Sequence, residues 1–305
     1  MLNTFLSVLP IFCLIVAGYV AKRRFLREDG FWKHVDKLVY YLFFPALLVL
    51  DISKANFTSA DTSSAIAATL GATLIVAGVI FIGQGVFRVK ADLFTSIFQG
   101  GVRYNSYVFI ALAHSLYGAE GVAVSGVFIA YMIVMTNVMS VLVMNHYGTA
   151  GKKSLRGMLV ALLQNPLIIG ALIGLLLNMG ELKIAGAVEQ FMSYLGNAAT
   201  PLSLMSVGAG LMLNLQGSRA LATLYVVGLK LLVLPMVTLA LLFSLGASGV
   251  PANVALLYAC VPCAGNAYIL ARQMGGDAPA MASMITWTTL ASTLTITLIL
   301  GAVTL

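Results

Sequence analysis

Long apolar stretches dominate the pattern along this chain, and polar residues fall in short clusters between them. About 20 consecutive apolar residues are enough for a helix to cross a bilayer. The pattern predicts ten such spans and an all-α polytopic membrane protein. The predicted spans cover residues 3–21, 35–52, 64–87, 92–116, 121–146, 158–179, 187–213, 220–245, 251–272 and 279–304.

Two predicted spans are interrupted by residues that disfavour a continuous helix. The ninth reads ACVPCAGNAYILAR and contains Pro262, Gly265 and Asn266. The fourth contains GGVRYNSYVFIA, with Gly101 and Asn105. Proline removes a backbone donor, glycine is permissive, and irregular backbone at membrane depth is tolerated only where protein buries it or water lines it. We therefore expect both spans to be broken helices beside a cavity, with the breaks at Gly101 and Pro262.

The two halves of the chain resemble each other. Pro10 and Gly18 of the first span recur 156 residues later as Pro166 and Gly174 of the sixth. Because each half holds five spans, an odd number, two similar halves must insert with opposite orientations. The predicted fold is thus a pair of inverted five-helix repeats, with fourth and ninth spans at matching places. The repeats are residues 1–150 and 151–305.

Composition supports insertion in a membrane. The chain is 60% hydrophobic and 9% charged, against roughly 25% charged residues in soluble domains. Its net charge of +7 could suggest nucleic acid, but the basic residues occur in short clusters between apolar spans. We therefore expect the lipid bilayer and no nucleic acid as a partner. The first span lacks a small-residue cleavage site and is expected to be a retained helix.

Basic residues predict the orientation. Thirteen of the 17 Lys and Arg residues fall on one side of the predicted topology, whereas only Lys54 and Lys183 fall on the other. Cytoplasmic loops carry the excess of Lys and Arg, so we expect a multi-pass cytoplasmic (inner) membrane protein with both termini outside. The short basic link at residues 147–157 leaves no room for a soluble domain between the halves.

Asn105, Asn266 and Arg103 are the first candidates for a binding site. Helix N-termini at a break attract carboxylates, and an amide adds donors without a buried charge. The alternative is that each Asn caps or joins neighbouring helices. Arg103 lies roughly 16 Å into its span at 1.5 Å per residue, where a charge usually faces a cavity. Its guanidinium suits a carboxylate, and an ion pair or a carbonyl cap is the alternative.

Other charged and aromatic residues complete the candidate set. Arg272 either lines an inner vestibule or anchors the span at the membrane surface. Lys230 is expected to extend its long stem toward the cytoplasmic surface. The predicted substrate-binding residues are Asn105, Asn266, Arg103, Tyr107, Tyr268, Gly265 and Arg272.

Proton coupling would need a titratable group in the pathway, and His114 and Asp36 are the candidates. An isolated His at a helix end is more often an interface residue. Cys260 and Cys263 form a C-x-x-C pair, but two further ligands for zinc are missing nearby. We therefore expect no metal and no cofactor. The sequence also offers no nucleophile constellation with usable context, so we do not expect an enzyme.

Three motifs resemble the auxin efflux carrier family over the whole chain: NPLIIGALIG, ATPLSLMSVGAGL, and PCAGNAYILARQMGGD followed by TWTTLASTLTI. Bacterial members include malonate and malate permeases. The resemblance implies a scaffold part and a transport part, crossing fourth and ninth helices that hold the anion, an elevator-like movement and a homodimer. The chain lacks the long central loop of plant members. It also has Gly100, Gly101 and Arg103 where the family often has proline in the fourth helix.

These observations lead us to expect a secondary transporter of small organic anions. Its substrates would be mono- or dicarboxylates such as malonate or malate, or auxin-like acids, with a proton as a candidate coupling ion. The alternative is a proton or sodium antiporter on a similar inverted-repeat fold. An antiporter needs essential carboxylates within the membrane, whereas the deep positions here are Asn and Arg.

Overall fold

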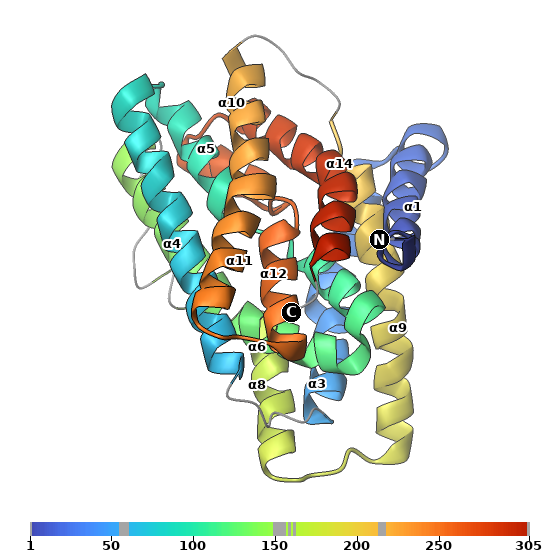
Figure 1. Ribbon diagram of the computed structural model, residues 1–305. Helices are drawn as coiled ribbons and strands as arrows, with labels where there is room; N and C mark the ends of the chain where they lie inside the picture. The colour runs from blue at the N-terminus through green and yellow to red at the C-terminus, as the bar shows by residue number, and fades with distance from the viewer. Residues whose placement is uncertain are drawn as a thin grey trace.

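The computed structural model describes residues 2–54, 61–148, 157, 160, 163–212 and 218–303, and every regular element within these ranges is helical (Figure 1). In chain order the elements are α1 (Leu2–Arg24), α2 (Asp29–Leu38), the π-helical turn η1 (Val39–Phe43), α3 (Phe44–Ser53), α4 (Asp61–Phe87), α5 (Ala91–Val102), α6 (Ser106–Tyr147), α8 (Pro166–Met179), α9 (Gly186–Ala209), α10 (Ser218–Gly228), the π-helical turn η2 (Leu229–Val233), α11 (Leu234–Ser244), α12 (Gly249–Cys260), α13 (Ala267–Met274) and α14 (Ala278–Ala302).

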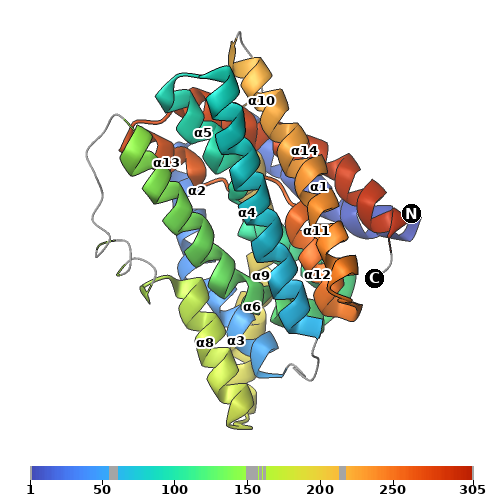
Figure 2. The same cartoon turned by 60° about the vertical axis from the view of Figure 1, so that its left-hand side comes forward.

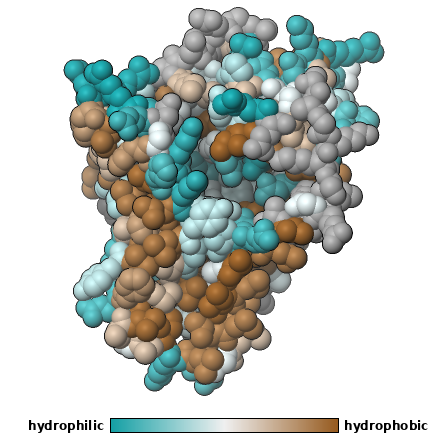
Figure 3. All heavy atoms as spheres, turned by 180° about the vertical axis from the view of Figure 1, so that it is seen from behind, coloured by the Kyte–Doolittle hydropathy of each residue, from teal (hydrophilic) through white to brown (hydrophobic). Residues whose placement is uncertain are grey.

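The helices have the length and surface of a membrane protein. Within the described ranges, four helical segments are long and apolar enough to cross a bilayer: Thr62–Phe87, Ala91–Tyr147, Arg219–Ser244 and Ala278–Ala302. Figure 3 shows an extensive apolar surface on the lower part of one face, with hydrophilic residues gathered at the upper end. The chain is therefore a polytopic α-helical membrane protein. The number of ten spans stays a prediction, and most of the predicted link between the halves lies outside the described residues.

The helices pack in two groups. In one group, α1 packs on α9, and α3 packs on both α8 and α9. Figures 1 and 2 show α3, α8 and α9 extending together beyond the lower end of the other helices. In the second group, α4 packs on α11 and α12, while α14 packs on α10, α12 and α13. Two sets of contacts join the groups. Helix α6 packs on α12 of the second group and on α1, α3, α8 and α9 of the first, and α1 also packs on α14.

Glycines allow α1 and α9 to approach closely. A Cβ at Gly18 would collide with the backbone carbonyl of Met205, and a Cβ at Gly208 would collide with that of Ile15. Helices in lipid associate through such small-residue contacts, because lipid chains are as apolar as the side chains and give no hydrophobic driving force. The α1–α9 contact therefore depends on the absence of side chains at both glycines.

This contact gives a stability prediction. We expect Gly18→Ala to destabilise the fold by roughly 1–3 kcal/mol, because the obstacle is backbone that cannot rotate away. Thermal unfolding in detergent measures the effect. Gly78→Ala in α4 is the matched control, since a Cβ there meets nothing within 4 Å and should leave stability equal or slightly higher. Equal melting temperatures for Gly18→Ala and the wild type would contradict the packing argument.

Two prolines and one glycine shape the helix paths. Each π-helical turn ends just before an X-Pro pair, so that Pro45 lies in the first turn of α3 and Pro235 in that of α11. Proline cannot donate a helical hydrogen bond and crowds the preceding turn, which the wider turn relieves. Gly118, with φ of 61°, bends the long helix α6. It lies between the fourth and fifth predicted spans, so the chain changes direction where the sequence placed a boundary.

Candidate functional site

The fourth predicted span is interrupted between α5 and α6. Helix α5 ends at Val102, and Arg103 is extended at φ −80° and ψ 151°. Helix α6 begins after Asn105, which is also extended. The expectation of a helix break at Gly101 is wrong by two residues, because α5 continues through this glycine. Gly101 instead packs closely, since a Cβ there would collide with Ile80.

The ninth predicted span is interrupted between α12 and α13. Helix α12 ends at Cys260, and Val261 is extended at φ −71° and ψ 151°. A residue before proline disfavours helical backbone, so Pro262 accounts locally for this end. Helix α13 begins at Ala267, after Asn266. Residues 261–266 therefore form the second non-helical segment, and both segments lie within apolar stretches.

A direct hydrogen bond joins the two interruptions. The backbone N–H of Asn105 donates to the carbonyl oxygen of Pro262 at 2.9 Å. A second hydrogen bond gives a backbone donor of the ninth-span segment a partner, because the N–H of Cys263 donates to Thr288 Oγ1 on α14 at 3.2 Å. Irregular backbone in an apolar environment needs such partners. The two segments, 161 residues apart at their asparagines, thus form one continuous structural unit.

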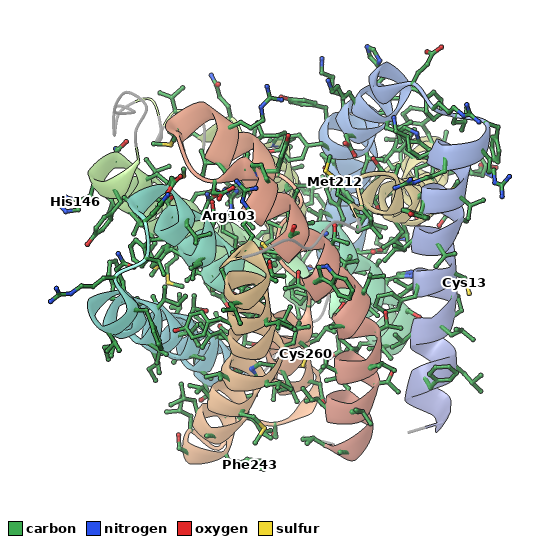
Figure 4. The ribbon with its side chains drawn as sticks, turned by 90° about the horizontal axis from the view of Figure 1, so that it is seen from above. Cys13, Arg103, His146, Met212, Phe243 and Cys260 are labelled. Atoms are coloured by element: carbon green, nitrogen blue, oxygen red, sulfur yellow. The ribbon has the colours of Figure 1, made fainter. Side chains whose placement is uncertain are left out.

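Arg103 is buried in this unit without a carboxylate partner. Its side chain is 7% exposed and donates to Gln99 Oε1 at 3.2 Å and to Asn266 Oδ1 at 3.1 Å. Both acceptors are neutral. In the described part of the chain the ion pairs are Lys54–Glu189 and Arg219–Asp277, and neither includes Arg103. A buried positive charge with only neutral partners favours an anion. Figure 4 shows Arg103 among the packed helices, inside the bundle.

Gln99 is a site residue that sequence reasoning missed. It is fully buried on α5, one helical turn before Arg103, and its Oε1 accepts a hydrogen bond from Nη1 of the guanidinium. The spacing of four residues was the available signal, because residues i and i+4 share one helix face. The neutral amide orients Arg103 without neutralising it.

The two asparagines differ in their roles. Asn105 caps α6, since its Oδ1 accepts from the N–H groups of Tyr107 and Val108 at 3.1 and 3.2 Å. The capping alternative is therefore present at Asn105, and it leaves the amide hydrogens to donate elsewhere. Asn266 accepts from Arg103 and makes no cap bond. It is exposed beside Gly265, where a Cβ would meet nothing within 4 Å. The two interrupted segments are therefore accessible from the side of Gly265 and Asn266.

The aromatic and basic candidates lie just beyond the interruptions. Tyr107 is half-buried and stacks on Phe44 of α3, with ring centroids 5.1 Å apart. Tyr268 is half-buried in the first turn of α13. The exposed Arg272 places its guanidinium 6.0 Å from the Tyr268 ring centroid. The structure thus pairs Tyr268 with Arg272, while Tyr107 connects the fourth-span interruption to α3.

The coupling candidates lie outside the two interruptions. His114 is exposed on α6, more than two turns beyond Asn105. Asp36 on α2 accepts a hydrogen bond from Ser206 on α9. Among the described residues, no hydrogen bond joins His114 or Asp36 to the interrupted segments. Their part in coupling therefore stays a prediction.

Lys230 overturns the expectation that its side chain reaches the membrane surface. It is 0% exposed in η2, and its Nζ lies 5.4 Å from the Tyr258 ring centroid. The helices around η2 enclose the stem, so the ammonium cannot follow the usual outward path. Cys260 and Cys263 are buried free thiols. No group of three or more metal-ligating side chains occurs among the described residues.

Two surface hollows lie away from the interrupted helices. One, of about 440 Å³, is lined largely by polar and charged residues and lies where α3 and α8 end and α9 begins, around Lys54 and Glu189. The other, of about 330 Å³, is mainly apolar and lies between α3, α8 and α9, around Pro45 and Pro166. Neither contains a predicted site residue, so the interrupted helices remain the better candidate site on chemical grounds.

The fold defines a polytopic membrane protein with a buried cation at its interrupted helices, and sequence comparison identifies its family. The family described as "Membrane transport protein" matches residues 4–300. The chain therefore belongs to this family, which confirms the resemblance to auxin efflux carriers. A relative from Rhizobium meliloti (strain 1021), described as "Putative malonate transporter", is 26% identical over 298 residues, covering 95% of this chain and 92% of the relative.

Proposed function

We propose that the protein is a secondary transporter that moves small organic anions across the cytoplasmic membrane. Arg103 carries the proposal, because it is a buried cation that bridges the two interrupted helices and has no carboxylate partner among the described residues. A bound carboxylate would supply the missing negative charge and could accept two parallel hydrogen bonds from the guanidinium. The proposed site comprises Arg103, Asn105, Gly265 and Asn266, with Tyr107, Tyr268 and Arg272 at its edges.

Helix ends add to the attraction for anions. Helices α6 and α13 begin directly after the two interruptions. The N-terminus of a helix carries a partial positive charge and unpaired N–H groups. Asn105 already satisfies two N–H groups of α6. The start of α13 receives no side-chain cap and adjoins the open space at Gly265. The N–H groups of Ala267, Ile269 and Leu270 there already bond to the backbone carbonyls of Ala264 and Asn266, so the attraction for an anion comes mainly from the partial positive charge of the helix end. We therefore place the carboxylate near the start of α13.

The packing favours alternating access by an elevator-type movement. In this proposal α1, α3, α8 and α9 form the scaffold, and the remaining helices carry the crossing fourth and ninth spans. The scaffold contacts agree with an inverted repeat, since exchanging the halves converts the α1–α9 contact into the α8–α3 contact. Figure 1 also places the end of α4 and the start of α10 opposite the connection between α8 and α9. In the sequence, Arg88 directly follows α4 and Arg219 is the second residue of α10, whereas Lys183 lies in the α8–α9 connection. That distribution supports the predicted orientation with both termini outside.

Mono- and dicarboxylates are the proposed substrate class, with malonate as the first candidate. The name of the Rhizobium relative suggests malonate, and the family resemblance adds malate and auxin-like acids. The proposed partners are the anion and the lipid bilayer, with a proton as the coupling ion and a second copy of the chain in a homodimer. Neither a cofactor nor an enzymatic step is part of the proposal.

Thermal stabilisation of the purified protein by small acids tests this function. A ligand that binds only the folded state stabilises it by mass action and so raises the melting temperature. At a ligand concentration of 100 times the dissociation constant, the free energy of unfolding increases by about 2.7 kcal/mol. We expect malonate or another short carboxylate to raise the melting temperature without sodium. Sodium chloride and a neutral diol of similar size serve as controls. Stabilisation by sodium or a pH change alone, with every acid ineffective, would instead favour the cation antiporter.

A further inference from the structure

Lys230 is a second buried cation close to the proposed anion site. Its side chain is 0% exposed, and no described group forms a hydrogen bond with its Nζ. The π-helical turn η2 that carries it packs against α5, α12 and α14. Burial of a lysine ammonium without a hydrogen bond destabilises a fold, so this residue needs an explanation beyond packing.

The ammonium lies against the last turn of α12, which directly precedes the ninth-span interruption. It faces the ring of Tyr258, in the last turn of α12, at 5.4 Å from the ring centroid. The Tyr258 ring in turn contacts the ring of Tyr104, with ring centroids 4.7 Å apart. Tyr104 lies between Arg103 and Asn105 in the fourth-span interruption. Figure 4 shows Cys260 and Arg103 both in the helical interior. Two successive ring contacts therefore connect the Lys230 ammonium to the interruption that carries Arg103.

Neighbouring elements do not neutralise Lys230. The sequences of α10, α11, α12 and α14 contain no Asp or Glu. The acidic residue of α5 is Asp92, in its first turn, at the end of α5 opposite Arg103. Its Oδ1 accepts from the adjacent N–H of Leu93. These elements therefore do not compensate the positive charge of Lys230, which can act on an anion bound at the proposed site.

We propose that Lys230 is a specificity-determining residue that makes the anion site prefer doubly charged over singly charged anions, without contacting the anion. This inference rests on the proposed function. The energy of a charge in the field of a fixed cation is proportional to that charge. A dicarboxylate therefore gains twice as much from Lys230 as a monocarboxylate does. Together, Arg103 and Lys230 supply two positive charges, which match a dianion.

Binding of malonate and acetate to Lys230→Met tests the proposal, at a pH at which malonate carries two charges and acetate one. Methionine fills a similar volume and removes the charge. We expect the dissociation constant to rise about tenfold for malonate and only about threefold for acetate, because the energies differ by a factor of two. The unliganded variant should melt about 3 °C higher than the wild type, since an unpaired buried charge is gone.

Leu231→Met is the matched control, because Leu231 is the next residue of η2 and is also 0% exposed. It should leave both dissociation constants unchanged. Equal weakening of malonate and acetate by Lys230→Met, or no weakening, would overturn the proposal. Failure of both Lys230→Met and Lys230→Gln to fold would also overturn it, because it requires the charge to oppose folding. A wild-type protein that binds neither acid would instead overturn the proposed function itself.

Discussion

Arg103→Gln is expected to weaken malonate binding about 100-fold while the protein still folds. Hydrogen bonds to a charged group contribute about 1.5–3 kcal/mol each, and the substitution removes both the charge and the paired donors. The fold should tolerate it, because Arg103 is buried with only the neutral partners Gln99 and Asn266. Malonate dissociation constants and flux into proteoliposomes measure the loss of binding, and the melting temperature measures the stability of the fold.

Arg103→Lys separates charge from geometry in this experiment. Lysine retains the positive charge but lacks the planar pair of donors that fits a carboxylate. We expect binding intermediate between the wild type and Arg103→Gln. If Arg103→Gln lowers the yield and the melting temperature yet binds malonate normally once purified, Arg103 has a structural role and the anion binds elsewhere.

Asn105→Asp is expected to abolish malonate transport without lowering the stability of the fold. Aspartate is as good an N-cap as asparagine, so it can accept the hydrogen bonds from Tyr107 and Val108 that Asn105 now accepts. It removes the amide donors, however, and places a negative charge beside Arg103. Like charges repel the substrate, and an ion pair with Arg103 would occupy the guanidinium. Flux into proteoliposomes and the melting temperature measure the two effects.

Asn105→Ala provides the comparison. It removes the cap as well as the donors, so the fold should lose about 1 kcal/mol while transport is also lost. The two variants together distinguish the cap from the site: both should fail to transport malonate, but only Asn105→Ala should melt earlier. Normal transport by Asn105→Asp would exclude the Asn105 amide from the binding site.

Several features of the site were predictable because they depend on neighbours in the chain. Pro262 excludes a regular helix through its own ring, so a break in the ninth span could be predicted. The deep Arg103 was identifiable from its distance to the end of an apolar stretch. The helix break predicted at Gly101 was wrong, because a glycine can either interrupt a helix or allow close packing within one. Only the position of Ile80 shows that packing applies.

The sequence alone determined the class of the molecule. Apolar stretches of bilayer length, the one-sided basic clusters and the family motifs are properties of the linear chain, and each reflects local hydrophobicity or charge. The sequence also supplied Arg103, Asn105 and Asn266 as candidates, since an intramembrane polar residue is conspicuous wherever it falls.

Only the tertiary structure decided how these residues act. The bond between Asn105 and Pro262, and the neutral partners of Arg103, depend on helices that are far apart in the chain. Lys230 shows the difference most clearly. Its long stem could reach the membrane surface on an isolated helix, but the surrounding helices enclose it. Long-range packing thus fixes which charges are buried and unpaired, because burial depends on residues that no local pattern contains.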